Sequence, residues 1–312
     1  MSENPSAVLR TRRRDRWVSA VGIRLLVGSA LLLAACRSST PPPAQSASPS
    51  EPVVHTYREV DGQALRAYVF PPAASHTKER AAAVLLFHGG GWSAGSPEWT
   101  FAAARRFASR GMVAVPIQYR LSEGDVTPIE ALADVCAAFR WARQRAGDLG
   151  LDAERVAGYG VSAGGHLVTS AATVGCPGEG SPGVRAEPDA LLLWSPALDM
   201  ARDGWFERKL QGRAKAETYS PVENVGASTP PTSIVQGAED TLTPLSGAER
   251  YCKRLTEAGG TCSLHVYKGV GHLLTRSLAQ QESDYDPDPQ AVADGIAQHL
   301  RFLAELGFIR TE

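Results

Sequence analysis

The sequence predicts a single α/β domain with a mostly parallel sheet and helices on both of its faces. Two observations lead to this prediction. From Val53 onward, short apolar runs alternate with longer amphipathic segments. One of these runs, Ala82–Phe87, is apolar throughout and shows no alternation, as expected for a strand that is covered on both faces.

The elements follow one another in a βαβα order. Strands are predicted at Val53–Tyr57 and Ala64–Phe70, which form an opening hairpin, and then at Ala82–Phe87, Met112–Gln118, Arg155–Tyr159, Ala190–Trp194, Thr232–Gln236 and Ser263–Tyr267. Helices are predicted at Phe101–Arg110, Pro128–Arg145, after Ser162, around Gly247–Glu257 and at Gln290–Glu305. Residues 201–229 have no strand pattern and are too few for a large lid, although Trp205 and Phe206 could lie near a site.

Charge in the folded part argues against a nucleic-acid partner. Without residues 1–36, the chain has 26 basic and 31 acidic residues, a net charge of −5. No basic stripe is present, whereas binding to phosphates needs clustered lysine and arginine.

The N-terminus predicts export and a lipid anchor. A cationic stretch, Arg10–Arg16, precedes the apolar run Leu25–Ala35, which is too short to span a bilayer but suits a signal peptide. The sequence Leu-Ala-Ala-Cys ending at Cys36 resembles a bacterial lipobox, in which the cysteine is lipidated and becomes the first residue of the mature protein. We therefore expect residues 1–36 to be a lipoprotein signal peptide and the protein to be attached to the cell envelope through Cys36. A plain secretory signal and a short uncleaved anchor are the alternatives.

Residues 37–52 are rich in serine, proline and alanine, which predicts a disordered tether. The domain would then occupy residues 53–312. Four further cysteines lie in it, Cys136, Cys176, Cys252 and Cys262. A bridge between Cys252 and Cys262 is conceivable in an exported protein, and buried free thiols are the alternative.

The central motif is Gly160-Val161-Ser162-Ala163-Gly164, which follows a predicted strand and opens a predicted helix. A nucleophilic serine needs this context, because it must be presented on a sharp, strained turn. The motif alone would arise by chance in roughly one chain in five of this composition, so the context carries the prediction that Ser162 is a nucleophile.

The second motif, His88-Gly89-Gly90-Gly91-Trp92, directly follows the strand Ala82–Phe87. Acyl transfer places negative charge on a carbonyl oxygen, and fixed N–H donors stabilise it. We expect the N–H groups of Gly90, Gly91 and Ala163 to form this oxyanion hole. A plain glycine-rich loop is the alternative, and His88 is expected to brace the loop.

An acid and a base are expected downstream, each after a strand. Asp240 follows Thr232–Gln236, and His272 follows Ser263–Tyr267. In this prediction His272 takes the proton from Ser162 and Asp240 orients the imidazole. The weaker candidates are Glu239, beside Asp240, His265, expected to be a packed or surface residue of a strand, and His166, expected to be structural.

Five ordered motifs together resemble the hormone-sensitive-lipase-like and feruloyl-esterase-like branch of the α/β-hydrolases: HGGGW, QYRL at 118–121, GYGVSAGGHL, QGAEDTLTP and GVGH. The resemblance spans residues 64–307 and implies an eight-stranded sheet and carboxylesterase-type activity. Gln118 stands where the family often has aspartate, and the N-terminal cap of some members is missing.

The sequence thus predicts a serine hydrolase that acts on small or short-acyl esters through an acyl-enzyme intermediate, without a metal or cofactor. Aryl formamidase or amidase activity on the same residues is the alternative within enzymes. A tethered binding protein without catalysis is the alternative outside them. The sequence does not indicate an oligomeric state.

Overall fold

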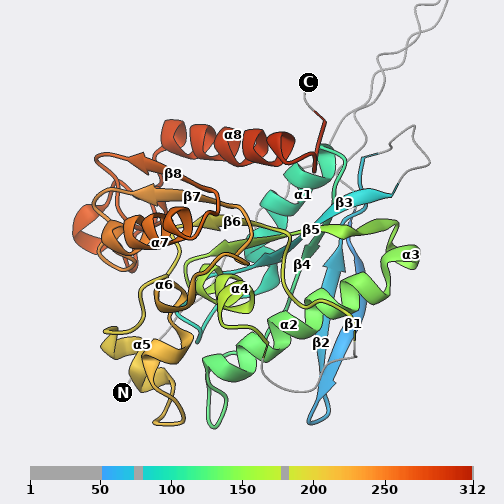
Figure 1. Cartoon of the computed structure of the whole chain (residues 1–312), viewed down its shortest axis with the longest axis horizontal. Coiled ribbons are helices and arrows are strands. Elements are labelled where there is room, and N and C mark those ends of the chain that lie inside the picture. Colours follow the sequence, from blue (N-terminus) through green and yellow to red (C-terminus); the bar gives the residue numbers. More distant parts are fainter. Residues whose placement is uncertain (1–50, 74–79, 177–182, 311–312) are drawn as a thin grey trace, which may run out of the picture. The chain divides into compact units, whose positions relative to one another are not determined.

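The computed structural model describes residues 51–73, 80–176 and 183–310 of the chain. The predicted signal peptide with Cys36, and all of the predicted tether except residues 51 and 52, lie outside the described residues. From residue 51 onward the fold is a single α/β domain (Figure 1).

The strands of the described part are β1 (Val53–Val60), β2 (Gln63–Val69), β3 (Ala81–Phe87), β4 (Val113–Pro116), β5 (Leu151–Val161), β6 (Ala190–Trp194), β7 (Thr232–Gly237) and β8 (Cys262–Tyr267). The α-helices are α1 (Phe101–Ser109), α2 (Pro128–Gln144), α3 (Ala146–Leu149), α4 (Ala163–Thr173), α5 (Gly204–Lys209), α6 (Pro221–Asn224), α7 (Leu245–Glu257) and α8 (Pro289–Glu305). The strands and longer helices predicted from the sequence are therefore confirmed, and α5 and α6 occupy the segment without a strand pattern.

Six strands form one parallel sheet in the order β4-β3-β5-β6-β7-β8. The eight expected strands are present, but they do not form one continuous sheet, because β1 and β2 form a separate two-stranded hairpin. Isolated antiparallel bridges connect β2 to the β4 region on either side of Pro116, at Ala67–Ile117 and Phe70–Ala114. Proline has no N–H to donate, which explains why no continuous ladder forms there.

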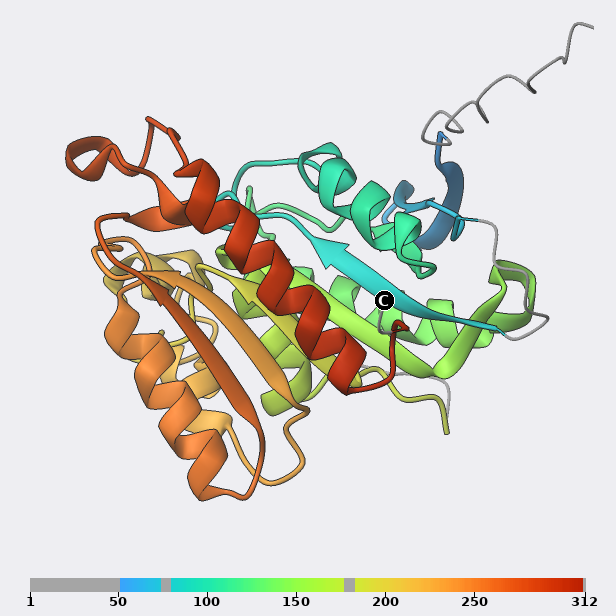
Figure 2. The ribbon, with the colours of Figure 1, turned by 90° about the horizontal axis from the view of Figure 1, so that it is seen from above.

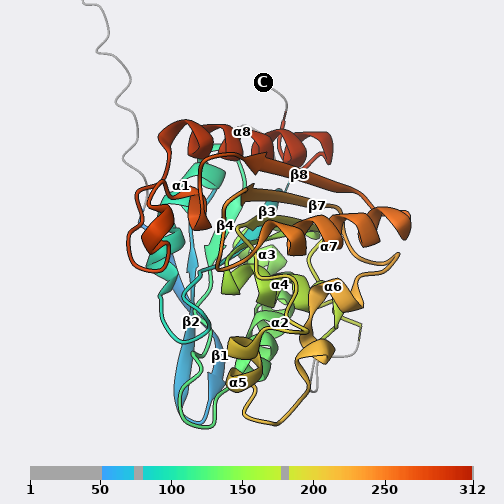
Figure 3. The ribbon, with the colours of Figure 1, turned by 90° about the vertical axis from the view of Figure 1, so that its left-hand side faces the viewer.

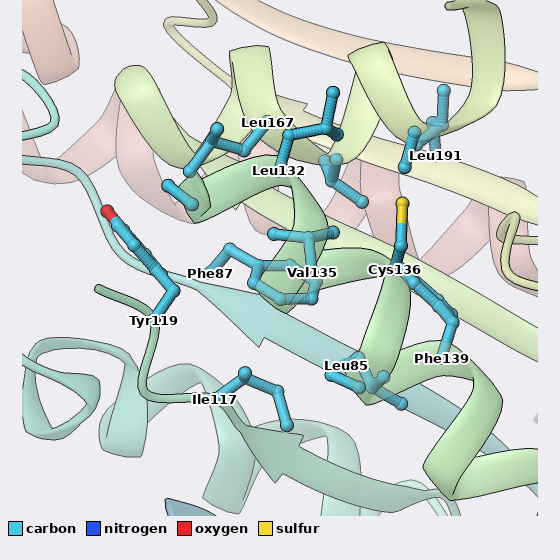
Figure 4. Close-up of a cluster of buried hydrophobic side chains, with 14 of the residues drawn as sticks. Leu85, Phe87, Ile117, Tyr119, Leu132, Val135, Cys136, Phe139, Leu167 and Leu191 are labelled. Atoms are coloured by element: carbon cyan, nitrogen blue, oxygen red, sulfur yellow. The ribbon is translucent and has the colours of Figure 1, made fainter. Parts of the chain in front are cut away.

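Side chains alternate between the two faces of the buried strands. Val84 and Leu86 pack on the face covered by α1 and α8, and Leu85 and Phe87 pack on the opposite face. Figure 2 shows α1 and α8 in front of the strands, and Figure 3 shows α2, α4 and α7 on the other side. The cluster between β3 and α2 contains Phe139, whose ring lies 5.8 Å from that of Phe87 (Figure 4). Burial on both faces explains why these strands are apolar throughout.

Two disulfides join the helices to their surroundings. Cys136 of α2 is bonded to Cys176, just after α4, with the Cα atoms 5.7 Å apart. Cys252 of α7 is bonded to Cys262 of β8, with the Cα atoms 5.3 Å apart. The bridge considered from the sequence is therefore present, and so is a second one.

No helix in residues 51–73, 80–176 or 183–310 combines the length and the apolar character that crossing a membrane requires.

The strand order reverses beside β3. The chain runs from β3 outward to β4 and then returns to β5 on the other side of β3. Ligands in open parallel sheets bind at the carboxyl ends of strands where such a reversal occurs. The loop after β3 carries Gly89–Gly91 and the turn after β5 carries Ser162, so both predicted motifs meet at this point.

Candidate active site

Ser162 lies in the sharp turn between β5 and α4. Its φ of 51° and ψ of −116° are strained for a residue with a side chain. The turn also brings backbone segments into close contact. A Cβ atom on Gly160 would lie 2.6 Å from the carbonyl oxygen of Gly164, and one on Gly164 would lie 2.3 Å from that of Phe87. Both glycines are therefore required by packing, and the predicted turn is present.

The structure brings His272 to Ser162. The Nε2 atom of His272 lies 3.1 Å from the Ser162 hydroxyl oxygen, and its Nδ1 atom lies 2.9 Å from Oδ2 of Asp240. The imidazole and the carboxylate are almost completely buried. These three side chains come from the turn after β5 and the loops after β7 and β8, and they form a continuous hydrogen-bonded chain.

Asp240 is held by more donors than the sequence indicated. Its Oδ1 accepts hydrogen bonds from the backbone N–H groups of Leu242 and Thr243, at 3.0 and 2.8 Å. Its Oδ2 accepts from Nε2 of Gln236 at 3.0 Å and from the Thr243 hydroxyl at 2.9 Å, in addition to facing His272. Donors to both oxygens fix the plane of the carboxylate and stabilise its charge.

The glycine loop after β3 packs directly against Ser162. A Cβ on Gly89 would lie 3.2 Å from the Cβ of Ser162, and one on Gly90, where φ is 114°, would lie 2.2 Å from the Ala94 carbonyl oxygen. Within the described ranges, the N–H groups of Gly90, Gly91 and Ala163 have no protein acceptor. They are thus available as donors beside the serine.

His88 braces this loop, as expected. Its Nδ1 lies 2.7 Å from the Gly89 carbonyl oxygen, and its ring stacks on Tyr119 at 4.3 Å. The Tyr119 hydroxyl donates to the His88 carbonyl oxygen at 2.8 Å. Burial lowers the pKa of His88 and raises that of Tyr119, so both side chains are neutral at pH 7.

His166 links the glycine loop to the segment between β6 and β7. Its Nε2 donates to the Tyr219 carbonyl oxygen at 2.8 Å, which leaves Nδ1 to accept from the indole N–H of Trp92 at 3.2 Å. Burial lowers the pKa of His166 to about 4. Phe206 of α5 packs against both rings, 5.0 Å from Trp92 and 4.7 Å from His166.

The alternative acid and base have other partners. Glu239 accepts from the backbone N–H of Gly269 at 2.9 Å, and so supports the loop that carries His272. His265 lies on β8, and its charged neighbours are Asp294 and Arg301. Neither side chain contacts Ser162 or His272.

Three supporting residues were not predicted. Gln281 accepts from the backbone N–H of His272 at 2.8 Å, and the Ser195 hydroxyl accepts from the N–H of Leu273 at 3.0 Å. The Thr243 hydroxyl, which donates to Asp240, also lies 3.0 Å from the Ser195 carbonyl oxygen and 3.1 Å from Nδ1 of His272. Only Thr243 had a signal in the sequence, because threonine shortly after an aspartate is typical of a side-chain-stabilised turn.

A cavity of about 210 Å³ lies beside this support. Thr243 lines it together with residues 196–200 and the start of α7, and charged side chains bound it: Asp199, Arg202 and Asp203. Among the residues that the structure describes, no three or more His, Cys, Asp or Glu side chains group so as to hold a metal ion.

A parallel sheet with a serine on the strand–helix turn at its carboxyl edge defines a class, the α/β serine hydrolases. Residues 84–216 match a family model described as the alpha/beta hydrolase fold. An arylesterase of Saccharolobus solfataricus is 31% identical over 210 residues, which cover 61% of this chain and 68% of that protein.

Further relatives are more distant or only partly covered. An ethyl acetate hydrolase of Pseudomonas putida is 26% identical over 273 residues, covering 77% of this chain and 80% of that protein. The chain spans only 40% of an acetylxylan esterase of Xylanibacter ruminicola, with 27% identity. Esterase 2 of Thermogutta terrifontis, solved with propionate bound, is 29% identical with a TM-score of 0.74, covering 84% of this chain and 97% of that one. The chain belongs to the α/β-hydrolase family, and it is a hydrolase of the carboxylesterase type.

Proposed function

We propose that the protein hydrolyses small, short-acyl esters with Ser162 as the nucleophile. The observation that carries this proposal is the 3.1 Å distance between the Ser162 hydroxyl and Nε2 of His272, with the serine on a strained turn. A hydroxyl in this position is activated when the imidazole accepts its proton.

The reaction would run in two steps. In the first, His272 accepts the proton of Ser162 while Oγ attacks the ester carbonyl carbon, and the N–H groups of Gly90, Gly91 and Ala163 stabilise the oxyanion. The C–O bond to the alcohol then breaks, and His272 gives its proton to the departing oxygen. In the second step, His272 takes a proton from a water molecule that attacks the acyl carbon. The bond from this carbon to Oγ of Ser162 then breaks, His272 returns the proton to Oγ, and the carboxylic acid leaves. The negative charge of Asp240 stabilises the imidazolium in both steps.

Short acyl groups are supported by the relatives. One relative is an ethyl acetate hydrolase, and the esterase of T. terrifontis has been solved with propionate and with butyrate. We therefore expect kcat/KM for p-nitrophenyl acetate and butyrate to exceed that for the decanoate. A preference for the decanoate would contradict the short-acyl part of the proposal.

Steady-state and burst kinetics test the chemistry. Wild-type protein should release p-nitrophenol from the acetate in an initial burst if deacylation is slow, and Ser162→Ala should reduce turnover by several orders of magnitude. Ser109→Ala, at the exposed end of α1, is a control that should keep the wild-type rate. Turnover by Ser162→Ala at the wild-type rate would show that another group is the nucleophile.

We also propose that the protein is exported and attached to the cell envelope through lipidated Cys36. The lipobox resemblance supports this. Growth with an alkyne-bearing fatty acid should label the wild type and not Cys36→Ser, and the variant should leave the membrane fraction. Equal labelling of the two proteins would contradict lipidation at Cys36.

A further inference from the structure

Trp205 is an exposed aromatic residue fixed beside the glycine loop. It lies on α5, which begins at Asp203, whose carboxylate accepts from the N–H groups of Trp205 and Phe206 at 2.8 and 2.9 Å. Phe206 is completely buried against Trp92 of the glycine loop. Trp205, the residue before Phe206, has 51% of its surface exposed. Its backbone is therefore held by a helix cap and by a buried neighbour, while its indole remains at the surface.

The indole of Trp205 lies beside Gly91, one of the predicted oxyanion donors. Its Nε1 atom is 3.7 Å from the position that a Cβ on Gly91 would take. Two cations of the same helix turn lie over the ring, Lys209 at 4.7 Å and Arg208 at 5.7 Å from its centroid. Such contacts favour one orientation of the indole. A large, flat side chain is thus set at the edge of the place where the ester carbonyl would lie.

The sheet order indicates which half of the ester Trp205 would face. The departing alcohol must receive its proton from Nε2 of His272, so it leaves on the side of the loop after β8. Gly91 belongs to the loop after β3, which lies on the opposite side of β5 from β6, β7 and β8. A side chain over Gly91 therefore flanks the acyl group, on the far side of the carbonyl carbon from the alcohol.

We propose that Trp205 is the wall that limits the length of the acyl group. This inference rests on the proposed ester hydrolysis at Ser162 and adds the residue that sets its acyl specificity. An acetyl or propionyl group fits between the scissile carbon and the indole, whereas a longer chain meets the ring. The anchoring by Phe206 prevents α5 from moving aside to admit it.

The acyl-length profile of Trp205→Ala tests the proposal. The ratio of kcat/KM for p-nitrophenyl octanoate to that for the acetate should rise about 10-fold or more. The reason is that gaining or losing room for a few methylene groups changes kcat/KM by at least that factor. Trp205→Phe keeps a ring but removes the indole N–H, and should keep a profile near that of the wild type. Tyr285→Ala, which removes another exposed aromatic residue, should leave the profile unchanged.

Three results would overturn the inference, and each is distinct from failure of the proposed function. An unchanged profile in Trp205→Ala with normal acetate turnover would show that Trp205 is no wall. An altered ratio between phenyl acetate and ethyl acetate, with an unchanged acyl profile, would place Trp205 on the alcohol side. A Trp205→Phe profile that admits long acyl groups better than that of Trp205→Ala would mean that the bulk of the side chain does not set the limit. Failure of the proposed function itself would appear as lack of ester turnover in the wild type.

Discussion

Replacing Asp240 with asparagine removes a charge and, because of its fixed surroundings, also reverses the imidazole tautomer. Oδ1 of Asp240 accepts two backbone N–H groups, from Leu242 and Thr243. The amide oxygen of an asparagine must stay there, since an NH₂ group would face two donors. The NH₂ group then takes the place of Oδ2, 2.9 Å from Nδ1 of His272.

An NH₂ group at this point forces Nδ1 of His272 to accept a hydrogen bond. The imidazole proton then lies on Nε2, which can no longer accept the proton of Ser162. The same change places two donors opposite each other, the new NH₂ and Nε2 of Gln236, 3.0 Å apart. We expect kcat to fall by about 10³–10⁴-fold, as loss of the correct tautomer does in other triads, and the free energy of unfolding to fall by about 1–3 kcal/mol for the unsatisfied buried group.

The assay is p-nitrophenyl acetate hydrolysis at saturating substrate, with urea unfolding measured in parallel. Glu239→Gln is the matched control, because its carboxylate is adjacent in sequence but bonds to the backbone of Gly269. It should retain a rate within about tenfold of the wild type. A folded Asp240→Asn protein with near-wild-type kcat, or a larger loss in Glu239→Gln, would contradict the role of Asp240 in setting the tautomer of His272.

Three other predictions concern stability. Burial lowers the pKa of His166 to about 4, from about 6.5 in the unfolded chain. The contribution of the neutral imidazole to the free energy of unfolding is therefore complete above pH 6.5, and about 3 kcal/mol is lost as the pH falls to 4. Urea unfolding at several pH values should show a shallower pH dependence for His166→Asn, and an equal dependence would contradict this prediction. Gly164→Ala would place a Cβ 2.3 Å from a backbone carbonyl oxygen and should abolish soluble, active protein. Gly226→Ala, whose Cβ would meet no atom within 4 Å, is the control and should remain soluble and active. An active Gly164→Ala protein would argue against the tight turn. Replacing Cys136 and Cys176 together by alanine opens a loop of 40 residues and should lower the free energy of unfolding by about 4 kcal/mol. A loss below about 1 kcal/mol, measured by urea unfolding, would indicate that the disulfide is not formed.

The sequence predicted the parts of this molecule that have a local pattern. Ser162, Asp240 and His272 could be proposed because each lies in the turn or loop that follows a predicted strand, and parallel strands bring their carboxyl ends to one edge. The glycine loop could be proposed because three successive glycines follow β3.

The supporting residues could not be found in this way. Gln281 lies nine residues after His272 in a segment without periodicity, and its role depends on how that segment folds back. The bridge between Cys136 and Cys176 joins α2 to the end of α4, which are neighbours only because both helices cover the same face of the sheet. The gap between β2 and β4 depends on Pro116 lying opposite β2, a matter of register that hydrophobic pattern does not reveal.

Labelling with a fluorophosphonate probe is the most direct test of Ser162 as the nucleophile, because the probe reacts covalently only with an activated serine. We predict one adduct per chain, located at Ser162 by peptide mass spectrometry, absent from Ser162→Ala and formed much more slowly in His272→Ala. An unlabelled wild-type protein, or an adduct on a different serine, would contradict the assignment of Ser162 as the nucleophile.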